Sequence, residues 1–306
     1  MADVLVLGGN GFLGSSLVDE LSSAGHRVTA FDRFSRPPVF TADGVRVLRG
    51  DLADRAAVAE ALLGHEVVFH FGGATTPASS VRDPGAEVRR EVESTIDMLE
   101  SAVAAGTRRV VFASTGGAIY GDKGDAAISE EIAPAPKSPY GIGKLAVEGF
   151  LRYFGEAEGL DTVALRISNP YGPRQRPDRD QGLIPIVLRR MARGEPVVVF
   201  GDGTMVRDYV YAPDVARQVA KLADADHRHG VYNVGSGVGR TVAEVLALAA
   251  EVVGRAPVIE HREAPPGFVH HSLLDVSRFD GEFGRTSLVG LDEGVALTWR
   301  AIAGES

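Results

Sequence analysis

Tyr140 and Lys144, four residues apart, are the side chains of this 306-residue chain whose types and spacing suit acid–base chemistry. Ser138 is a favourable helix N-cap and Pro139 suits the first helical position, so a helix is predicted to begin here with Tyr140 in its first turn. The tyrosine and the lysine would then lie on one face of the helix. The ammonium group and the positive helix end should lower the pKa of the phenol from about 10, which would make Tyr140 a general base for a substrate hydroxyl.

The hydroxyl groups of Ser114 and Thr115 follow a strand pattern at residues 109–113. They would lie at the carboxyl end of that strand, where open α/β sheets bind their ligands. A tyrosine and a lysine at this spacing are also a common structural feature of helices. The two hydroxyls at the strand end are what favours the catalytic interpretation.

A glycine-rich turn, the first of the elements that must position this chemistry, follows an apolar strand pattern at residues 4–7. It contains Gly8, Gly11 and Gly14 and precedes a helical pattern that opens at Ser15. Glycines allow positive φ and a close approach of the backbone to a pyrophosphate, which the N–H groups and dipole of the helix attract. The sequence therefore predicts a dinucleotide site; the simpler alternative is a tight strand-to-helix turn without a ligand.

Asp32 ends a second strand pattern, at residues 27–31, close to the position about 20 residues downstream at which an acid binds the ribose hydroxyls of a dinucleotide. A carboxylate here favours NAD because it would repel the 2′-phosphate of NADP. The adjacent Arg33 could accept that phosphate, and Asp32 could also be only a solvated loop acid.

Strand and helix patterns alternate along this part of the chain and predict an α/β fold with a Rossmann-type, doubly wound parallel sheet. Further strands are expected at residues 45–48, 66–71 and 163–167, and helices at residues 53–63 and 87–105.

Two of these strands end in residues that could contact a cofactor. Asp51 and Leu52 follow the third strand, where an adenine ring could be met, although Asp51 could instead cap the next helix. Phe71, Gly72 and Gly73 end the fourth strand, and the glycines would let the backbone lie against a cofactor.

From about residue 169 the pattern becomes irregular and predicts a second, smaller mixed α/β domain. A helix at 183–193, a strand at 196–200 and a helix at 241–253 with a capping box of Thr241 and Glu244 are expected. Residues 230–235 would return to the large sheet, and the remainder, with Pro265-Pro266-Gly267, is a small mixed region. We therefore predict a dinucleotide-binding domain at 1–168 plus about 204–235, and a substrate domain at about 169–203 plus 236–306.

Composition limits the class of protein. The chain is 44% hydrophobic and 24% charged, which is ordinary for a globular protein, and its net charge of -9 argues against binding nucleic acid or an anionic membrane. There is no cysteine, which excludes thiolate catalysis and disulfides. No apolar run approaches the roughly 18 residues of a membrane span, and a strand starts close to Met1, so the cytoplasm is expected.

Five motifs of this chain together resemble the extended short-chain dehydrogenases/reductases, specifically the NAD-dependent nucleotide-sugar epimerase/dehydratase family. They are the glycine turn, Asp32, the Ser-Thr strand end, the Tyr-x-x-x-Lys pair and the Asn-Pro-Tyr-Gly of residues 169–172. The resemblance continues through residues 207–211 and 214–216 and covers nearly the whole chain. Residues 175–178 and 201–203 are most similar to members that epimerise UDP-sugars at C4.

For the reaction, the resemblance implies that Tyr140 is the base and that Lys144 orients Tyr140 and the nicotinamide ribose. Thr115 or Ser114 would hydrogen-bond the sugar O4. Counted back from Tyr120, the chain has one residue more than the family's usual serine–threonine segment, so the choice between the two hydroxyls stays open.

For binding, the resemblance implies that Asn169 meets the nucleotide diphosphate and that Arg207 neutralises it; a surface ion pair with Asp208 is the alternative for Arg207. Arg262 is a second candidate for the diphosphate. The residues assigned to NAD are Gly8, Gly11, Phe12, Leu13, Gly14, Asp32, Arg33, Asp51, Leu52, Phe71, Gly72, Gly73, Tyr140 and Lys144. The adjacent His270 and His271 would point to opposite faces of an extended segment, so no metal is expected and they could line the sugar pocket.

Where the family's dehydratases carry Asp-Glu, this chain has Gly116 and Gly117, which cannot transfer protons. The predicted function is therefore NAD-dependent epimerisation of a nucleotide-diphosphate sugar, most closely a UDP-sugar, at C4 through a transient 4-keto intermediate. A dehydratase, a decarboxylase or a 4-keto reductase is the alternative.

The helices expected at 87–105 and 140–158 resemble those that pair subunits of the family through a four-helix interface, so a homodimer is predicted. The first of them should carry one apolar face for core or partner-helix packing, made of Val88, Val92, Ile96, Leu99 and Val103.

Overall fold

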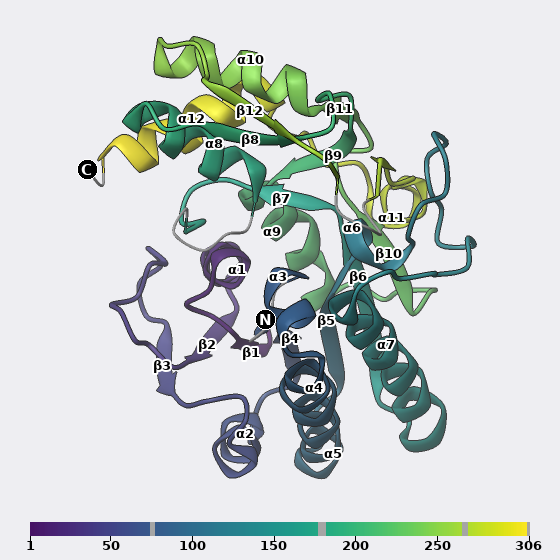
Figure 1. Ribbon diagram of the computed structural model, residues 1–306. Coiled ribbons are helices and arrows are strands. Elements are labelled where there is room, and N and C mark those ends of the chain that lie inside the picture. The colour runs from purple at the N-terminus through teal and green to yellow at the C-terminus, as the bar shows by residue number, and fades with distance from the viewer. Residues whose placement is uncertain (74–76, 177–181, 265–268, 305–306) are drawn as a thin grey trace.

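The computed structural model describes residues 1–73, 77–176, 182–264 and 269–304 (Figure 1). Its centre is a seven-stranded parallel sheet in the order β10-β6-β5-β4-β1-β2-β3. The strands are β1 (Asp3–Leu7), β2 (Arg27–Asp32), β3 (Arg46–Arg49), β4 (Val67–His70), β5 (Arg109–Thr115), β6 (Asp161–Ile167) and β10 (Val231–Val234). The chain turns to opposite sides of β1 at β2 and β4, so a crevice opens at the carboxyl ends of these strands. The predicted fold class is confirmed.

Helices cover both faces of this sheet because its strands are apolar on both faces. Val4 and Val6 of β1 face α1 (Phe12–Ser23) and α9 (Ala212–Ala220), whereas Leu5 and Leu7 face the other layer. That layer consists of α2 (Arg55–Leu62), α5 (Ser94–Ala105) and α7 (Pro139–Glu158). Each fully buried aliphatic side chain of this kind contributes about 1.5–3 kcal/mol to folding.

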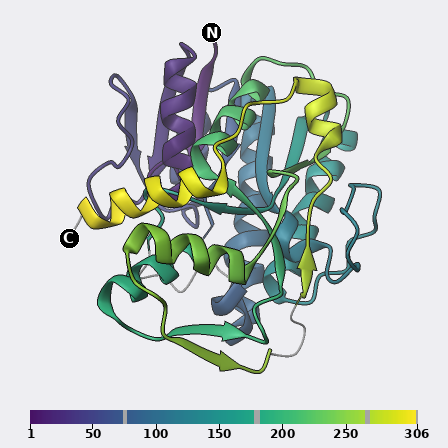
Figure 2. The ribbon, with the colours of Figure 1, turned by 90° about the horizontal axis from the view of Figure 1, so that it is seen from above.

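A smaller domain lies beyond the carboxyl ends of the central strands of the large sheet (Figure 1). Strand β9 (Val206–Tyr211) pairs with β7 (Asn169–Tyr171), β11 (Gly239–Thr241) and β13 (His271–Ser272), and β8 (Val197–Phe200) pairs with β12 (Ile259–Arg262). Helices α8 (Leu183–Arg193), α10 (Val242–Val253) and α12 (Leu291–Gly304) share its apolar core. Figure 2 shows α10 and α12 side by side. Two short helices, α6 (Gly116–Ile119) and α11 (Ser277–Phe283), lie nearer the large sheet.

Two features of the smaller domain differ from the prediction. Residues 169–171 were expected to be irregular but form β7, because they pair with β9. The predicted division placed residues 206–211 with the dinucleotide-binding domain, whereas their pairing partners belong to the smaller sheet. Residues 177, 178 and 265–267, which the sequence patterns include, lie outside the described residues.

Helix caps follow the sequence closely at two sites. The side chain of Ser138 accepts a hydrogen bond of 3.2 Å from the amide of Gly141, so α7 begins at Pro139 as predicted. Thr241 and Glu244 form the predicted capping box at the start of α10. The orientation of Tyr140 and Lys144 therefore depends on a local signal that the sequence already carries.

The helix predicted over 87–105 is not regular. It consists of α4 (Pro84–Glu87), a π-helical stretch η1 (Val88–Glu93) and α5. The wider π turn shifts the register of the helix, so that Glu87 and Glu91 are 1% and 2% exposed. Val88, expected on the apolar face, is 58% exposed. Val88 is therefore not part of the core of the subunit, and packing against a partner helix, the other interpretation of this face, stays a prediction for it.

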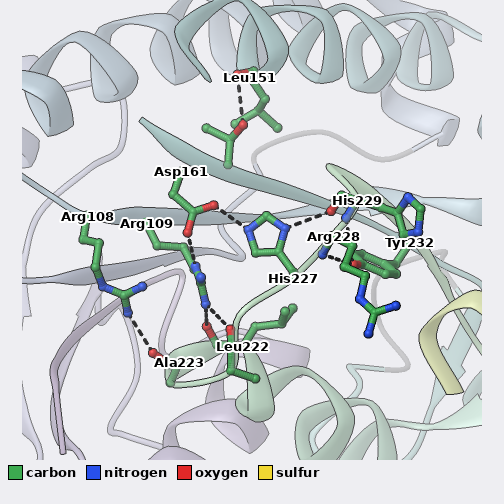
Figure 3. A network of polar contacts seen from close by, with 12 residues as sticks. Arg108, Arg109, Leu151, Asp161, Leu222, Ala223, His227, Arg228, His229 and Tyr232 are labelled. Carbon is green, nitrogen blue, oxygen red and sulfur yellow. Dashed lines mark hydrogen bonds and ion pairs between the residues drawn. The ribbon is translucent and has the colours of Figure 1, made fainter. Parts of the chain in front are cut away.

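A buried guanidinium joins β5 and β6 to the loop that leads into β10 (Figure 3). Arg109 donates from Nε to Oδ2 of Asp161 over 2.6 Å. It also donates from Nη1 to the carbonyl oxygens of Leu222 (2.8 Å) and Ala225 (2.5 Å). The ring of His227 binds the other oxygen of Asp161. The arginine thus satisfies carbonyl groups at the end of η2 (Lys221–Ala223), which follows α9.

We predict that Asp161→Asn lowers the free energy of unfolding at pH 7 by about 2 kcal/mol, because a charged hydrogen-bond partner of a buried arginine is lost. Burial alone would raise the pKa of Asp161, but hydrogen bonds from His227 and Arg109 outweigh it and hold the pKa below 3.8. The carboxylate therefore stabilises the fold above its ordinary pKa, and this contribution is lost as the pH falls through the lower folded value. Chemical denaturation across this acidic range should show a flatter pH dependence in the variant.

Asp97→Asn is the matched control, since Asp97 pairs over 2.7 Å with Arg55, whose side chain is 57% exposed. It should lose less than about 1 kcal/mol. Equal losses in the two variants would contradict this account of the buried arginine.

Candidate active site

A cavity of about 940 Å³ lies between the carboxyl ends of the central strands and the smaller domain. Its lining includes nearly all of the predicted site residues: Gly8, Gly11, Phe12, Leu13, Asp32, Arg33, Asp51, Leu52, Phe71, Gly72, Gly73, Ser114, Thr115, Tyr140, Lys144, Asn169 and Arg207. Gly14 and Arg262 are not part of the lining. Residues spread over some 200 positions of the sequence thus meet in one cavity.

The glycine turn is packed against backbone on two sides. Gly8 has φ +81°, and a Cβ on it would lie 2.5 Å from the amide nitrogen of Gly72 at the end of β4. A Cβ on Gly14 would overlap the carbonyl oxygen of Gly8. Gly14 therefore supports the turn from behind, and the two strand ends come close enough for one ligand to contact both.

Helix α1 begins at Phe12, earlier than the predicted start at Ser15, because Gly11 is its N-cap. The side chains of the described residues leave this N-terminus uncapped, and Gly11, Phe12 and Leu13 line the cavity. Free amide groups and the positive helix end form an anion site, which suits the pyrophosphate of a dinucleotide.

The carboxylate of Asp32 is fixed in the cavity wall by backbone amides. Oδ2 accepts a hydrogen bond of 3.1 Å from Asn10, and Oδ1 accepts one of 2.7 Å from Arg33. Arg33 and Arg36 line the same end of the cavity. A carboxylate at the end of β2 suits ribose hydroxyls, and together with the glycine turn these residues fit NAD.

Asp51 lines the cavity and does not cap the next helix. The N-cap of α2 is Asp54, whose side chain accepts a hydrogen bond of 3.1 Å from the amide of Ala57. Asp51 accepts one of 3.0 Å from the amide of Ala53 in the turn before the helix. The capping interpretation of Asp51 is therefore wrong, because a second good N-cap residue lies three positions later.

Lys144 is buried beneath Tyr140 on the same face of α7. Its Nζ lies 5.8 Å from the centroid of the Tyr140 ring and 4.4 Å from that of Phe112, and it donates a hydrogen bond of 3.0 Å to the carbonyl oxygen of Ala113. Nζ also forms an ion pair with Glu91 of η1. The pair of residues predicted from their spacing is thus assembled, with an acid added behind it.

The two strand-end hydroxyls point in different directions because alternate residues of a strand face opposite sides. The hydroxyl of Thr115 lies on the side of Tyr140 and acts to lower the pKa of its phenol. Ser114 donates a hydrogen bond of 2.6 Å to Oε1 of Glu148, which also forms a buried ion pair with Arg166. Ser114 therefore belongs to a buried polar cluster, whereas the hydroxyl of Thr115 is on the side of Tyr140.

The phenol of Tyr140 differs from the prediction in its protonation. Burial raises its pKa above 10, and the carboxylates of Glu91 and Glu87 add to this effect, whereas Lys144 and Thr115 act against it. For Lys144, burial would lower the pKa, but Glu91, Tyr140 and Glu87 raise it above 10.5. The prediction of a pKa lowered toward neutrality is therefore wrong for the protein without ligands, because it considered the lysine and not the two acids.

Glu87 and Glu91 are the functional candidates that sequence reasoning missed. The signal that could have found them was their i, i+4 spacing, which places two acids on one side of a helix that must pack near Lys144. A regular helix over 87–105 would have been expected to bury Val88 and Val92 instead. The π turn overrides that expectation.

Among the residues predicted to bind substrate, Asn169 and Arg207 line the cavity. Arg207 donates hydrogen bonds to the backbone carbonyls of Val206 (2.7 Å) and His270 (3.1 Å). The alternative of an ion pair with Asp208 is wrong, because the Asp208 carboxylate is fully buried and turned to another segment.

Asp208 joins separate passes of the chain. It accepts hydrogen bonds from the amide (2.8 Å) and hydroxyl (2.6 Å) of Ser236 and from the amide of Gly237 (3.2 Å). Burial raises its pKa although these hydrogen bonds act against the shift. Asp208 is thus structural, beside a cavity-lining arginine.

Arg262 and the histidine pair are not among the residues that line the cavity. Arg262 donates from Nε over 2.9 Å to its neighbour Glu260 on the exposed strand β12. His270 and His271 do not contribute to the lining, and His271 is part of β13 beside β9. The expectations that Arg262 meets the diphosphate and that the histidines line the sugar pocket are not supported by these positions.

The parallel sheet, the uncapped glycine turn and the Thr115–Tyr140–Lys144 group define an enzyme of the dinucleotide-dependent short-chain dehydrogenase/reductase class. A sequence model of the NAD dependent epimerase/dehydratase family matches residues 4–235, and the chain belongs to this family. The predicted family and its NAD cofactor are confirmed.

Relatives of this chain are similar over its whole length. It is 33% identical to the UDP-glucose 4-epimerase of Mycolicibacterium smegmatis over 303 residues, which cover 96% of each chain. Its fold matches the UDP-glucose 4-epimerase of Thermus thermophilus in complex with NAD with a TM-score of 0.92, at 36% identity over 99% of this chain and 100% of that one. The UDP-glucose 4-epimerase of Thermotoga maritima with UDP-glucose gives a TM-score of 0.91, at 35% identity over 99% of each chain.

We predict that Asp32→Asn reduces the preference for NAD over NADP by about tenfold or more. The variant removes a charge that repels the 2′-phosphate, and at a partly buried site this repulsion raises the binding free energy of NADP by more than about 1.4 kcal/mol. Arg33 and Arg36 at the same end of the cavity would then attract the 2′-phosphate. Dissociation constants for both dinucleotides, measured by calorimetry, test this. Asp54→Asn removes the same charge outside the cavity and keeps a good N-cap, so its preference should equal that of the parent. An unchanged preference in Asp32→Asn would refute the assignment of Asp32 to the ribose.

Proposed function

We propose that this protein is an NAD-dependent 4-epimerase of a nucleotide-diphosphate sugar, with a UDP-sugar as the first candidate. The observation that carries the proposal is the group of Thr115, Tyr140 and Lys144 in one cavity with the glycine turn. The relatives whose names state UDP-glucose 4-epimerase activity support the choice of reaction.

In this reaction the residues of the chain remove one proton, from O4 of the sugar, and later return it. Tyr140 takes the O4 proton of the sugar while Thr115 holds O4 by a hydrogen bond, and the Lys144 ammonium stabilises the phenolate that forms. Bound NAD supplies the acceptor for the C4 hydride and then the donor that returns it. The 4-keto sugar then rotates so that its opposite face receives the hydride, and Tyr140 returns the proton to O4. The configuration at C4 is thus inverted without net oxidation.

We assign the diphosphate to the side of the cavity formed by Asn169 and Arg207. The Asn169 amide is oriented by its own hydrogen bond, of 3.2 Å, to the carbonyl oxygen of Asp208. Burial lowers the pKa of Arg207, yet its guanidinium remains a cation at neutral pH and suits a diphosphate. An anchor at this end would let the sugar ring turn while the nucleotide stays bound.

The dehydratase and decarboxylase alternatives need an acid on α6, where this chain has glycines. A Cβ on Gly116 would overlap the side chain of Leu274, and one on Gly117 would lie 3.4 Å from Oδ1 of Asn169. An acidic side chain at the first position would therefore require the buried side chain of Leu274 to move. Glu87 and Glu91 lie behind Lys144 and not on this wall.

Incubation with a panel of UDP- and dTDP-sugars, followed by NMR, tests the proposed function. We expect a C4 epimer pair at equilibrium, without loss of water or carbon and without net NADH. A dehydrated or decarboxylated product, or one formed only with consumption of NADH, would replace the proposal with one of its alternatives.

Three variants should separate the roles of the hydroxyl groups. Tyr140→Phe should slow turnover by about 10²- to 10⁴-fold, the range of a lost general base. Thr115→Val should slow it by about 10- to 100-fold, since a hydrogen bond to a charged group is lost in the transition state. Ser114→Ala should keep kcat and instead lower the melting temperature, because Glu148 loses a buried donor. The opposite order of Thr115→Val and Ser114→Ala would make Ser114 the catalytic hydroxyl.

We further propose that a second copy of the chain packs on the face formed by α7 and η1. Ile142 and Tyr153 on α7 are 55% and 56% exposed, and Val88 of the neighbouring η1 is 58% exposed. Gly149, between the first two on the same side of α7, has open space around it and would allow a helix to approach closely. Large apolar side chains gathered on one face are typical of an interface.

Sedimentation at micromolar concentration should therefore show a dimer, and Tyr153→Asp should convert it to a monomer. Val258→Asp, which places the same charge on a 57% exposed valine of the smaller domain, should stay dimeric. A monomeric parent protein would contradict the proposal.

A further inference from the structure

Glu91 of η1 lies between Lys144 and Gly73 in the cavity wall. One of its carboxylate oxygens, Oε1, pairs with Nζ of Lys144. The other, Oε2, faces Gly73, where it would lie 3.5 Å from a Cβ on that residue. Gly73 lines the cavity, so within the described part of the chain glycine backbone lies between the carboxylate of Glu91 and the cavity.

Glu87 reinforces this arrangement from the previous turn. Its carboxylate packs against the backbone of α7 at Gly143, where a Cβ would come within 2.5 Å of Oε1. Both acids depend on the π stretch, because the shifted register turns residues 87 and 91 toward α7. Neither acid is used in the proton transfer described above.

Among the described residues, the Lys144 ammonium forms an ion pair with Glu91, and the charge of Glu87 also acts on it. Two further titratable groups of this cluster carry no charge before reaction. Burial lowers the pKa of His70 to about 3, with a smaller contribution from Lys144, so its ring is uncharged at neutral pH. The phenol of Tyr140 is protonated before reaction. Arg90 lines the cavity from η1 but is exposed, so solvent screens its charge.

We propose that Glu91, supported by Glu87, is a positioning residue that holds the Lys144 ammonium and offsets its charge, so that this end of the cavity favours the oxidised, cationic nicotinamide ring over the reduced, neutral one. The inference rests on the proposed function. A lysine without a counter-charge would repel the cation that must accept the C4 hydride. With Glu91 in place, return of the hydride to the 4-keto sugar is favoured, and escape of that intermediate is reduced.

The test is the reduction potential of the bound cofactor, which a purely structural role would not move. Holoenzyme is equilibrated against a reference redox couple, and the absorbance of the reduced ring is followed. Glu91→Gln, which keeps the shape of the side chain, should lose about tenfold of the preference for the oxidised form, equivalent to a rise of about 30 mV for a two-electron couple. Glu87→Gln should shift the potential in the same direction.

The matched control is Glu93→Gln, which removes an acid from the same π stretch at a less buried position and should leave the potential unchanged. Glu91→Asp, which retains the charge, should recover most of the parent value. If Glu91→Gln folds with an unchanged melting temperature and an unchanged potential, the inference is wrong. If Glu91→Gln does not fold, an unchanged potential in Glu87→Gln overturns the inference equally.

The outcome is independent of the sugar panel. A shifted potential in a protein that forms no C4 epimer would overturn the proposed function and keep the role of Glu91 toward the cofactor. Epimerisation with a potential insensitive to Glu91 and Glu87 would do the reverse.

Discussion

The ammonium of Lys144 is a charge buried inside the protein, and much of the site is arranged to make that possible. An isolated buried ion costs several kcal/mol, so its surroundings must supply counter-charge and acceptors. Glu91, the carbonyl of Ala113 and the ring of Phe112 do so from two different elements. Helix α7 is thereby held in register with β5 and with the π stretch, and this register also brings Tyr140 to Thr115.

Features that follow from local chemistry could be predicted from the sequence. The glycine turn, Asp32, the Ser138 cap and the Tyr-x-x-x-Lys spacing each need only a few neighbouring residues, and the parallel sheet follows from the alternation of strands and helices. The π stretch could not be predicted, because one extra residue per turn leaves no periodic signal. Consequently the pKa of Tyr140 was misjudged, since its nearest acids lie about 50 residues away along the chain.

Other differences from the prediction have similar physical causes. Which of Ser114 and Thr115 faces the cavity depends on the side of β5 on which α7 packs, which is a property of tertiary structure. Asp51 and Asp54 are equally good caps by residue type, and only the geometry of the turn decides between them. The pairing of β9 with strands from three distant segments cannot be read from its own residues. The sequence therefore does not show to which domain the residues after 204 belong.

The carboxylate of Asp208 has a mechanical consequence. The chain passes between the two domains after Ser168, after β9 and again near Gly235. Asp208 of β9 accepts hydrogen bonds from Ser236 and Gly237 at the last of these crossings. The amide of Ser168 at the first crossing donates a hydrogen bond of 2.9 Å to the carbonyl oxygen of Val234. A single crossing could act as a hinge between the two domains. Crossings that are hydrogen-bonded to one another restrict such a hinge motion. The cavity should accordingly be a chamber of nearly constant shape, in which a released keto sugar rotates without the walls reopening to bulk water.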